Sequence, residues 1–287
     1  MAVITEEKAI QLFPFLSGKG SHLKYKIALK ATGIDYVNRI HQNLEDQGVP
    51  PGPDFAKGLI LDQIGVDMLI GNPENLDLFP QGAFITISNH FYGHLDGIAL
   101  VDVVGHLRPK VKVMVNELLM NISGLAPNFI SVNPTTTKRE TTATNINGVK
   151  NALLQLKSGE PLCLFPSGAV ADLKPRQGWI LSERDWQDAA VRLIRKARVP
   201  VVPIRFFDRN SWFYYALGLI DYRIRFVRLF SELKSMRGTR HRMGIGRVIS
   251  VQEQAAVPDS EFKDFLRRSV YDMPLPEHFV KRSELWK

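Results

Sequence analysis

Short apolar runs that alternate with helical patterns fill the chain from about residue 66 onward. The apolar runs predict strands at 67–70, 83–88, 111–115, 129–132, 162–165 and 201–206. Apolar residues spaced three and four apart predict helices at 97–107 and 146–156. Strands that alternate with helices are typical of α/β layer folds. We therefore expect an α/β domain with a mixed, mostly parallel sheet flanked by helices.

The last third of the chain carries weaker signals. The sequence Ser-Glu-Arg-Asp at 182–185 resembles a capping box, in which the first and fourth side chains bond the backbone where a helix begins. It predicts a helix over the residues that follow. Further helices are expected at 211–220 and 261–270, and further strands at 224–227 and 243–249.

The first fifty residues have a different character. Residues 5–47 show the spacing of two or three helices, and the run GVPPGPD at 48–54 breaks that pattern strongly. We therefore divide the chain into an N-terminal helical segment, residues 1–50, and an α/β domain, residues 51–287. Asp54 is placed to cap the next helix, which is expected to end near Ile64.

Basic residues are unevenly spread along the chain. Lysines interleave with apolar residues at 24–32, as in helices that lie in a membrane interface, although ordinary surface helices share this pattern. The net charge is +8, and residues 171–247 hold seventeen Lys and Arg against seven Asp and Glu. A basic face attracts nucleic acid, anionic lipid head groups or the phosphates of a carrier molecule. No nucleic-acid motif accompanies it, which favours a membrane surface or a phosphate-bearing carrier as partner.

Composition indicates a globular protein. Hydrophobic residues make up 45% and charged residues 23% of 287 positions. The single cysteine, Cys163, lies in an apolar run and permits no internal disulfide, which fits a reducing compartment. We find no secretory signal and no run of about 18 apolar residues that would span a membrane. We therefore expect peripheral attachment to the cytoplasmic face of the cell membrane.

The stretch FITISNHFYGHLDGIAL at 84–100 carries the clearest chemical signal. A strand ends in Asn89 and His90, a turn with Gly93 follows, and Asp96 lies where an apolar helix begins. Histidine can act as a general base near neutral pH, and a carboxylate on one ring nitrogen leaves the other free to take a proton. Residues six apart lie about 240° apart on a regular helix, so these two side chains meet only across an irregular turn, which glycine permits. Such a base can activate a hydroxyl or amine for attack on an acyl donor.

Asn-His, a glycine-bearing turn and Asp-Gly resemble the His/Asp motif of the glycerolipid acyltransferase superfamily, the lysophosphatidic acid acyltransferase-like proteins. Five residues separate His90 from Asp96, whereas four is the superfamily's commonest spacing. The bacterial hemolysin-like branch, which is linked to aminolipid O-acylation, is similar in carrying the extra residue. We therefore expect this chain to resemble that branch most closely.

Three further blocks extend the resemblance over about residues 83–204. Residues 117–132 resemble the second block, Phe-Pro-Ser-Gly at 165–168 the third block, and Val-Val-Pro-Ile at 201–204 the fourth. The resemblance implies that His90 and Asp96 are catalytic. It also implies a substrate-binding set: Asn89, Asn133, Phe165, Pro166, Ser167 and Gly168.

Three positions depart from the enzymes that act on phosphate-bearing acceptors. In those enzymes the second block ends in arginine, and the third carries an acid and an arginine; here Asn133, Ser167 and Val170 occupy these places. Neutral side chains do not replace the guanidinium charge that binds a phosphate. We therefore expect a lyso-aminolipid acceptor, such as an N-acylated ornithine or glycine. The alternative acceptor, lysophosphatidic acid, would need a charge from elsewhere in the chain: Lys138, Arg139 or Arg205.

The resemblance implies direct acyl transfer. His90 takes the proton of the acceptor hydroxyl, Asp96 orients His90, and the hydroxyl attacks a thioester carried by acyl carrier protein or CoA. We expect no cofactor beyond this co-substrate, no metal and no covalent acyl-enzyme, because Cys163 in an apolar strand is a poor nucleophile. Backbone N–H groups around Gly168 are the expected donors to the oxyanion.

Two other classes of function fit some of the same residues. His90 and His94, four apart with Asp96 nearby, could belong to the metal site of a hydrolase. A zinc site needs at least three protein ligands, and Gly93 interrupts the helix that would hold both histidines. The chain could also bind lipid at a membrane without catalysis. Metal analysis and a His90→Ala variant distinguish these functions from acyl transfer.

Overall fold

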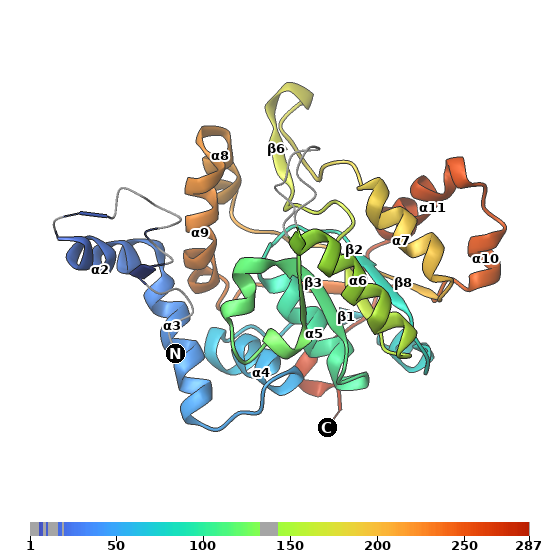
Figure 1. The fold of residues 1–287 in the computed structure, drawn as a ribbon, viewed down its shortest axis with the longest axis horizontal. Coiled ribbons are helices and arrows are strands. Elements are labelled where there is room, and N and C mark those ends of the chain that lie inside the picture. Colours follow the sequence, from blue (N-terminus) through green and yellow to red (C-terminus); the bar gives the residue numbers. More distant parts are fainter. Residues whose placement is uncertain (1–5, 8–9, 11–16, 19, 133–142, 287) are drawn as a thin grey trace.

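The computed structural model describes residues 6–7, 10, 17–18, 20–132 and 143–286, and an eight-stranded sheet crosses this part of the chain (Figure 1). The strand order is β10-β1-β9-β8-β2-β5-β3-β4. The strands of this sheet are β1 Leu69–Gly71, β2 Ile85–Ser88, β3 Lys112–Asn116, β4 Phe129–Val132, β5 Leu162–Leu164, β8 Val201–Phe206, β9 Arg242–Ile245 and β10 Phe279–Lys281.

Helices lie on both faces of the sheet and at its ends. The α-helices are α2 Ser21–Thr32, α3 Ile34–Asp46, α4 Pro53–Lys57, α5 Leu95–Leu107, α6 Ala143–Lys157, α7 Asp188–Ala197, α8 Trp212–Ile220, α9 Tyr222–Ser235, α10 Val251–Ala255 and α11 Asp259–Tyr271. A π-helix, Gly58–Ile64, continues α4. A separate two-stranded hairpin consists of β6 Asp172–Lys174 and β7 Ile180–Ser182.

Five neighbouring strands form the parallel part of the sheet. β8, β2, β5, β3 and β4 share one direction, and β2 pairs with both β5 and β8. β9 is antiparallel to β8, β1 is parallel to β9, and β10 is antiparallel to β1. The expected α/β fold, with a mixed, mostly parallel sheet flanked by helices, is confirmed. The carboxyl ends of β2, β5 and β8 meet at one edge, which is where ligands bind in open α/β sheets.

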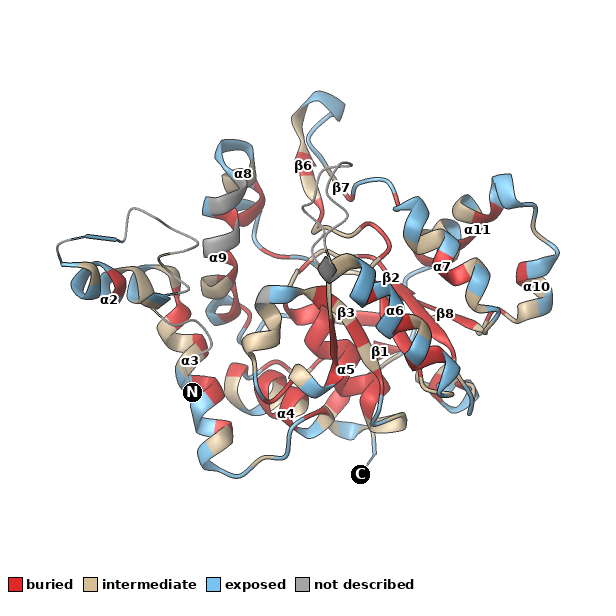
Figure 2. Cartoon of the chain, in the orientation of Figure 1, coloured by how far each residue is buried: buried red, intermediate tan, exposed pale blue. Residues whose placement is uncertain are grey.

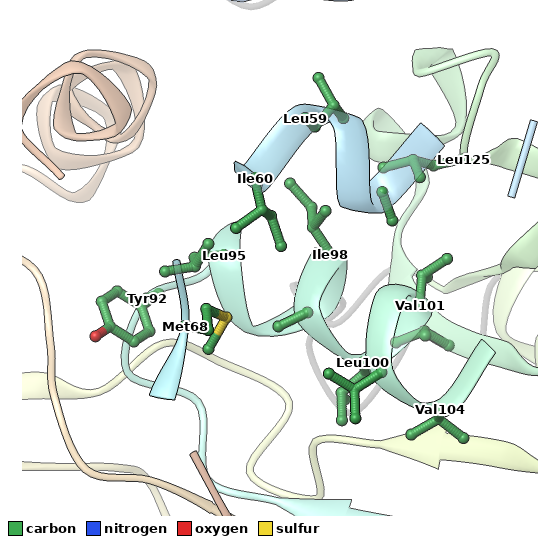
Figure 3. Packing of buried hydrophobic residues seen from close by; sticks show 14 of the residues in the cluster. Leu59, Ile60, Met68, Tyr92, Leu95, Ile98, Leu100, Val101, Val104 and Leu125 are labelled. Carbon is green, nitrogen blue, oxygen red and sulfur yellow. The ribbon is translucent and has the colours of Figure 1, made fainter. Parts of the chain in front are cut away.

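Helix α5 is buried along almost its whole length. It packs against the sheet on one side and against α4 and the π-helix on the other. Figure 3 shows Ile60 of the π-helix beside Leu95 and Ile98 of α5. A helix that is apolar on most sides needs such a cover over its whole circumference. This packing fixes the first turn of α5, which carries Asp96.

Helices α6, α7 and α11 cover the opposite face of the sheet. Their apolar side chains form one cluster with Ile85 and Ile87 of β2. The helical members of this cluster are Ala152, Leu156, Leu193, Ile194, Phe262, Leu266 and Val270. Because both faces are covered, the central strands are apolar on both sides, which explains their continuous apolar runs.

The N-terminal helices α2 and α3 pack beside α9 at one end of the molecule (Figure 1). Apolar residues of α3, among them Ile40 and Leu44, join the same core cluster as α5. The division of the chain at residue 50 stays a prediction. Within the described residues, no helix has the length and apolar character needed to cross a membrane.

The helix start expected at 182–185 is wrong. Ser182 ends β7 of the hairpin, which the sequence pattern did not predict, and α7 begins later with Gln187 as its N-cap residue. The strand expected at 224–227 is also wrong, because these residues lie within α9. Arg225 and Leu229 are both buried there, and residues four apart share one face of a helix.

Two smaller expectations also differ from the structure. The strand expected at 243–249 ends at Ile245, and Ser250 then caps α10 through a capping box. Asp54 does not cap α4, because Gly52 occupies the N-cap position and Asp54 lies within the first turn.

Candidate active site

The Asn89 side chain, just after β2, forms two hydrogen bonds with the backbone of β8. Its Nδ2 donates to the carbonyl of Phe206 at 2.8 Å, and the N–H of Phe206 donates to Asn89 Oδ1 at 2.7 Å. The side chain is buried. These two bonds fix the backbone position from which His90 follows. Both polar atoms of Asn89 are engaged within the protein, and its expected role in substrate binding stays a prediction.

An irregular turn brings His90 and Asp96 together. Residues 91–94 are not helical, Gly93 has a φ of 88°, and α5 begins at Leu95. A Cβ atom on Gly93 would stand 2.7 Å from Val170 Cγ2, so glycine is required both by the backbone and by the space. Because the chain turns here, His90 Nδ1 lies 2.7 Å from Asp96 Oδ2.

Hydrogen bonds hold the Asp96 carboxylate from every side. Besides His90, its Oδ2 accepts the N–H groups of Tyr92 at 3.2 Å and Gly93 at 3.3 Å, and its Oδ1 accepts that of Gly97 at 3.1 Å. The carboxylate is fully buried. Four donors around one carboxylate stabilise its ionised form, as a buried charge requires.

His90 and Asp96 each stabilise the charged form of the other. Burial alone would lower the pKa of His90, but the charge of Asp96 and the hydrogen bond to it, with help from Glu183, hold that pKa above its usual value. Burial opposes the ionisation of Asp96, yet His90 and the turn N–H groups hold the pKa of Asp96 below its usual value. An ionised Asp96 accepts the Nδ1 proton and leaves Nε2 to act as a base. The His90 side chain is 16% exposed, and no described residue bonds Nε2.

The turn at residues 165–168, the third block, packs beside the His90 side chain. The Phe165 ring stacks on the His90 imidazole with centroids 4.2 Å apart. The carbonyl of Pro166 accepts the N–H of Gln187. Gly168 has a φ of 67°, and a side chain there would overlap Gln187. The Gly168 N–H donates to the carbonyl of Phe165, so the expectation that it binds an oxyanion is wrong for Gly168 itself.

A second carboxylate, which no sequence pattern indicated, reaches the site from the residue after β7. Glu183 Oε1 accepts the backbone N–H of His90 at 2.7 Å and the hydroxyl of Ser167 at 2.7 Å. Glu183 and Ser167 are each 2% exposed. Burial raises the pKa of Glu183 to about 7, although Ser167 and His90 oppose the shift. The structure therefore joins Ser167 to the site through Glu183.

A family model described as an acyltransferase matches residues 7–275. This chain belongs to that acyltransferase family. A lyso-glycine lipid O-acyltransferase from Bacteroides thetaiotaomicron is 29% identical over 232 residues, which cover 74% of this chain and 81% of that protein. A second lyso-glycine lipid O-acyltransferase, from Phocaeicola vulgatus, is 29% identical over 259 residues, which cover 84% and 87%.

The family match and these two relatives confirm the resemblance to the glycerolipid acyltransferase superfamily. Among solved structures, the 1-acyl-sn-glycerophosphate (LPA) acyltransferase PlsC from Thermotoga maritima matches with a TM-score of 0.46 and 13% sequence identity. The match covers 93% of this chain and 86% of that one.

Two side chains that follow β8 also hold the turn at residues 91–94 of the acyltransferase. Asn210 Nδ2 donates to the carbonyl of Tyr92 at 2.8 Å, and the Tyr215 hydroxyl donates to the carbonyl of Phe91 at 2.6 Å. These bonds satisfy the two carbonyls of a buried irregular turn that has no helix to bond them. They join positions 118 and 124 residues apart, so no local sequence pattern could have pointed to them.

Among the described residues, Arg205 and Arg225 are basic side chains that could serve an acceptor phosphate, and both are engaged elsewhere. Arg205 donates to backbone carbonyls at the end of α11 and just beyond it. Arg225 reaches the base of the hairpin, where it donates to the carbonyl of Ala171 at 3.1 Å and to Asp172 Oδ1 at 2.8 Å. Three expected positions lie outside the described residues: Asn133, Lys138 and Arg139.

The other candidate groups are poorly suited to chemistry. Cys163 is buried in β5, and burial raises the pKa of its thiol to about 12. His94 is the N-cap residue of α5, and burial lowers its pKa to about 4. Among the described residues, no group of three or more His, Cys, Asp and Glu side chains could hold a metal ion. His90 and Asp96 therefore remain the pair with the clearest chemical capacity.

Proposed function

We propose that this acyltransferase moves a fatty acyl group from an acyl thioester to the hydroxyl of a lysolipid, and that its acceptor is a lyso-aminolipid. One observation carries the proposal. The 2.7 Å contact between His90 Nδ1 and Asp96 Oδ2 leaves Nε2 without a partner among the described residues, at the carboxyl edge of a parallel sheet. An oriented imidazole with one free nitrogen is what general-base activation of a hydroxyl requires.

In the proposed reaction His90 Nε2 removes the proton of the acceptor hydroxyl while the hydroxyl oxygen attacks the thioester carbonyl. The ionised Asp96 stabilises the imidazolium that forms. The tetrahedral intermediate then loses its C–S bond, and the imidazolium returns the proton to the leaving thiolate. An ester and a free thiol result, and His90 is neutral again. Hydrogen-bond donors other than the Gly168 N–H must stabilise the oxyanion.

Two observations support an aminolipid acceptor over a phosphate-bearing one. Both relatives reported above are named lyso-glycine lipid O-acyltransferases. In the third block, Ser167 is bound to Glu183, and Val170 brings no charge to the turn. Arg225 shares its charge with Asp172. A phosphate monoester at this turn would therefore meet the Glu183 carboxylate, and neither Val170 nor Arg225 would supply a free guanidinium, which disfavours its binding. The donor is proposed to be acyl carrier protein or CoA, which present the same thioester.

Thioester consumption by the purified protein tests this function. Wild type and His90→Ala are compared with acyl carrier protein and CoA donors and with lyso-glycine lipid, lyso-ornithine lipid and lysophosphatidic acid as acceptors. We expect a loss of at least about a hundredfold in the variant, the usual scale for a general base. A wild type that consumes thioester equally fast with lysophosphatidic acid would contradict the aminolipid acceptor. Wild type and variant that both bind lysolipid but consume no thioester would favour lipid binding without catalysis.

We also propose that the acyltransferase works on a membrane surface. Large exposed apolar side chains gather on the hairpin, α8 and the start of α9: Trp179, Ile180, Trp212, Phe213, Leu219, Ile220 and Ile224. Figure 2 shows the hairpin tip and the outer end of α8 as exposed and projecting on the same side of the molecule. Arg209 and Arg228 lie over the rings of Trp212 and Phe213. Aromatic and basic residues together suit an anionic lipid interface.

Vesicle co-sedimentation tests the attachment. Phosphatidylglycerol vesicles are expected to bind the protein more tightly than phosphatidylcholine vesicles. Replacing Trp179 and Ile220 by serine should weaken binding at least about tenfold, because each large apolar side chain contributes about 1.5–3 kcal/mol when buried. Leu154→Ser is the matched control, since Leu154 is 52% exposed but lies on α6. Equal binding by the double variant and wild type would exclude this surface as the site of attachment.

A further inference from the structure

Glu183 is a buried carboxylate beside His90 to which the proposed reaction gives no role. It comes from the hairpin, 93 residues after His90, and is 2% exposed. Its Oε1 accepts two hydrogen bonds, from the backbone N–H of His90 and from the hydroxyl of Ser167. This single oxygen therefore connects the strand end that carries the base with the turn that carries Phe165.

The other oxygen of Glu183 is in an unfavourable position. Oε2 is buried and has no hydrogen-bond partner among the described residues. Lys174 lies close but donates to the backbone carbonyl of Glu183, at 3.2 Å, and no described Lys or Arg forms an ion pair with the carboxylate. A buried carboxylate without a cationic partner is destabilising. A glutamine could accept the same two hydrogen bonds through its Oε1 without burying a charge, although its NH2 group would be buried without an acceptor. Hydrogen bonding alone therefore does not explain a charged residue here.

We propose that Glu183 is a positioning residue and the second carboxylate of the acyl-transfer site, which holds the His90 backbone and stabilises the positive charge that the imidazole gains when it takes the acceptor's proton. This inference rests on the proposed function. Asp96 contacts the ring through Nδ1, whereas Glu183 holds the backbone of the same residue. Two carboxylates therefore bond to the residue whose ring becomes an imidazolium, one through the ring and one through the backbone. The charge of Glu183 also raises the pKa of His90, in the same direction as Asp96.

The groups that face Glu183 determine its pKa and so the pH range in which it is charged. They are His90, the Ser167 hydroxyl, Asp96 of α5 and Lys174 of β6. Burial and the charge of Asp96 raise the pKa of Glu183, and Ser167 and His90 lower it, with the result at about 7. The carboxyl group is therefore neutral in mild acid and charged above neutrality. The proposed support for the imidazolium increases as pH rises through this range.

Folding stability should change with pH in the opposite sense. The pKa of Glu183 in the folded protein lies above its unfolded value, so the folded state binds the proton more tightly between these two values. Stability is therefore lost as pH rises from about 4.5 through about 7. A residue kept at a cost to stability is typical of a functional site. Glu183→Gln should raise the midpoint of thermal unfolding at pH 8, whereas a purely structural carboxylate should lower it on replacement.

The decisive experiment compares Glu183→Gln with Ser167→Ala in two readouts. The first is the titration of the His90 ring followed by NMR without substrate, which does not depend on the proposed function. The second is the pH profile of kcat/KM for thioester consumption. In Glu183→Gln the pKa of His90 should fall, because the charge of Glu183 raises it. The acid limb of the profile should then move to lower pH, and the plateau should fall about tenfold. Ser167→Ala keeps the carboxylate but removes a hydrogen bond that lowers the pKa of Glu183. The His90 titration should therefore still show two steps, with the Glu183 step moved to higher pH.

Other results would decide against the proposal. An unchanged His90 titration in a folded Glu183→Gln protein would show that the carboxylate acts only as a hydrogen-bond acceptor. If this variant does not fold, the wild-type titration decides, because a coupled neighbour with a pKa of about 7 gives the His90 resonances two steps. A single step would overturn the proposal. A normal His90 shift in a protein that is inactive with every donor and acceptor would instead contradict the proposed function.

Discussion

Asp96→Asn tests whether the His90–Asp96 pair works as proposed. Asp96 accepts hydrogen bonds from His90 Nδ1 and from three backbone N–H groups, and is fully buried. An asparagine has one acceptor oxygen. If that oxygen faces His90, the new NH2 group faces the N–H of Gly97; if it faces Gly97, the NH2 group faces His90 and two turn N–H groups. Both orientations leave donors opposed, at a cost of about 1–3 kcal/mol.

The effect on catalysis should exceed the effect on folding. The amide carries no charge, so nothing from residue 96 opposes the burial that lowers the pKa of His90. The base is then weaker, and the imidazolium forms without its main counter-charge. We expect kcat to fall by about 10²–10⁴-fold, which corresponds to about 3–5 kcal/mol of transition-state stabilisation. In wild type the rate falls as pH drops through the raised pKa of His90, because the base must be neutral. In the variant this acid limb should lie at lower pH.

Thioester consumption across pH measures both effects, and circular dichroism confirms the fold. Asp102→Asn is the matched control, because Asp102 is buried in the same helix but pairs with Arg282. It should reduce stability while kcat per folded molecule stays near wild type. An Asp96→Asn protein with a rate within about threefold of wild type and the same acid limb would refute the role given to Asp96.

Three further substitutions can be tested by activity or by unfolding. Gly93→Ala places a side chain at a φ of 88° and 2.7 Å from Val170 Cγ2, so it should displace the turn and lower kcat by about a hundredfold, with a smaller loss of stability. Arg282→Ala leaves the buried Asp102 with only the His106 imidazole as an ion-pair partner, so urea unfolding should show a loss of about 3–5 kcal/mol, and a loss under 1 kcal/mol would contradict this. Cys163→Ala should keep near wild-type activity, because burial raises the pKa of the thiol and makes it a poor nucleophile; inactivation by this change would favour an acyl-enzyme.

The elements that the sequence predicts well are those that bury a continuous apolar run. The expected strand at 201–206 coincides with β8, and the expected helix at 97–107 forms the larger part of α5. Both lie under a layer of helices or strands on each side, so nearly every side chain had to be apolar. The elements that were missed are short and half-buried. β6, β7 and β10 have three residues each, too few to show an alternating pattern.

The wrong expectations have a common physical cause. At 182–185 a pattern that is sufficient to start a helix is overridden, because the Glu183 carboxylate finds its partners at His90 and Ser167 instead. At 224–227 a short run with Ile224, Phe226 and Val227 predicted a strand. Arg225 is nevertheless buried within α9, because Ala171 and Asp172 accept its hydrogen bonds. In both segments a charged side chain bonds to residues that are remote in sequence, and this cannot be read from neighbours along the chain.

The catalytic pair is made of residues that lie close in sequence, whereas the residue that changes the pKa of His90 is remote in sequence. His90 and Asp96 lie six residues apart, and one glycine turn suffices to join them, so the pair can be recognised in a sequence. The basicity of His90 depends on more than this pair, because Glu183 reaches it from a hairpin 93 residues away. Acyltransferases that share the motif but lack a carboxylate at this place should therefore catalyse the same step with a different pH dependence. A substitution in the hairpin can then shift the working pH of the enzyme while the motif itself stays unchanged.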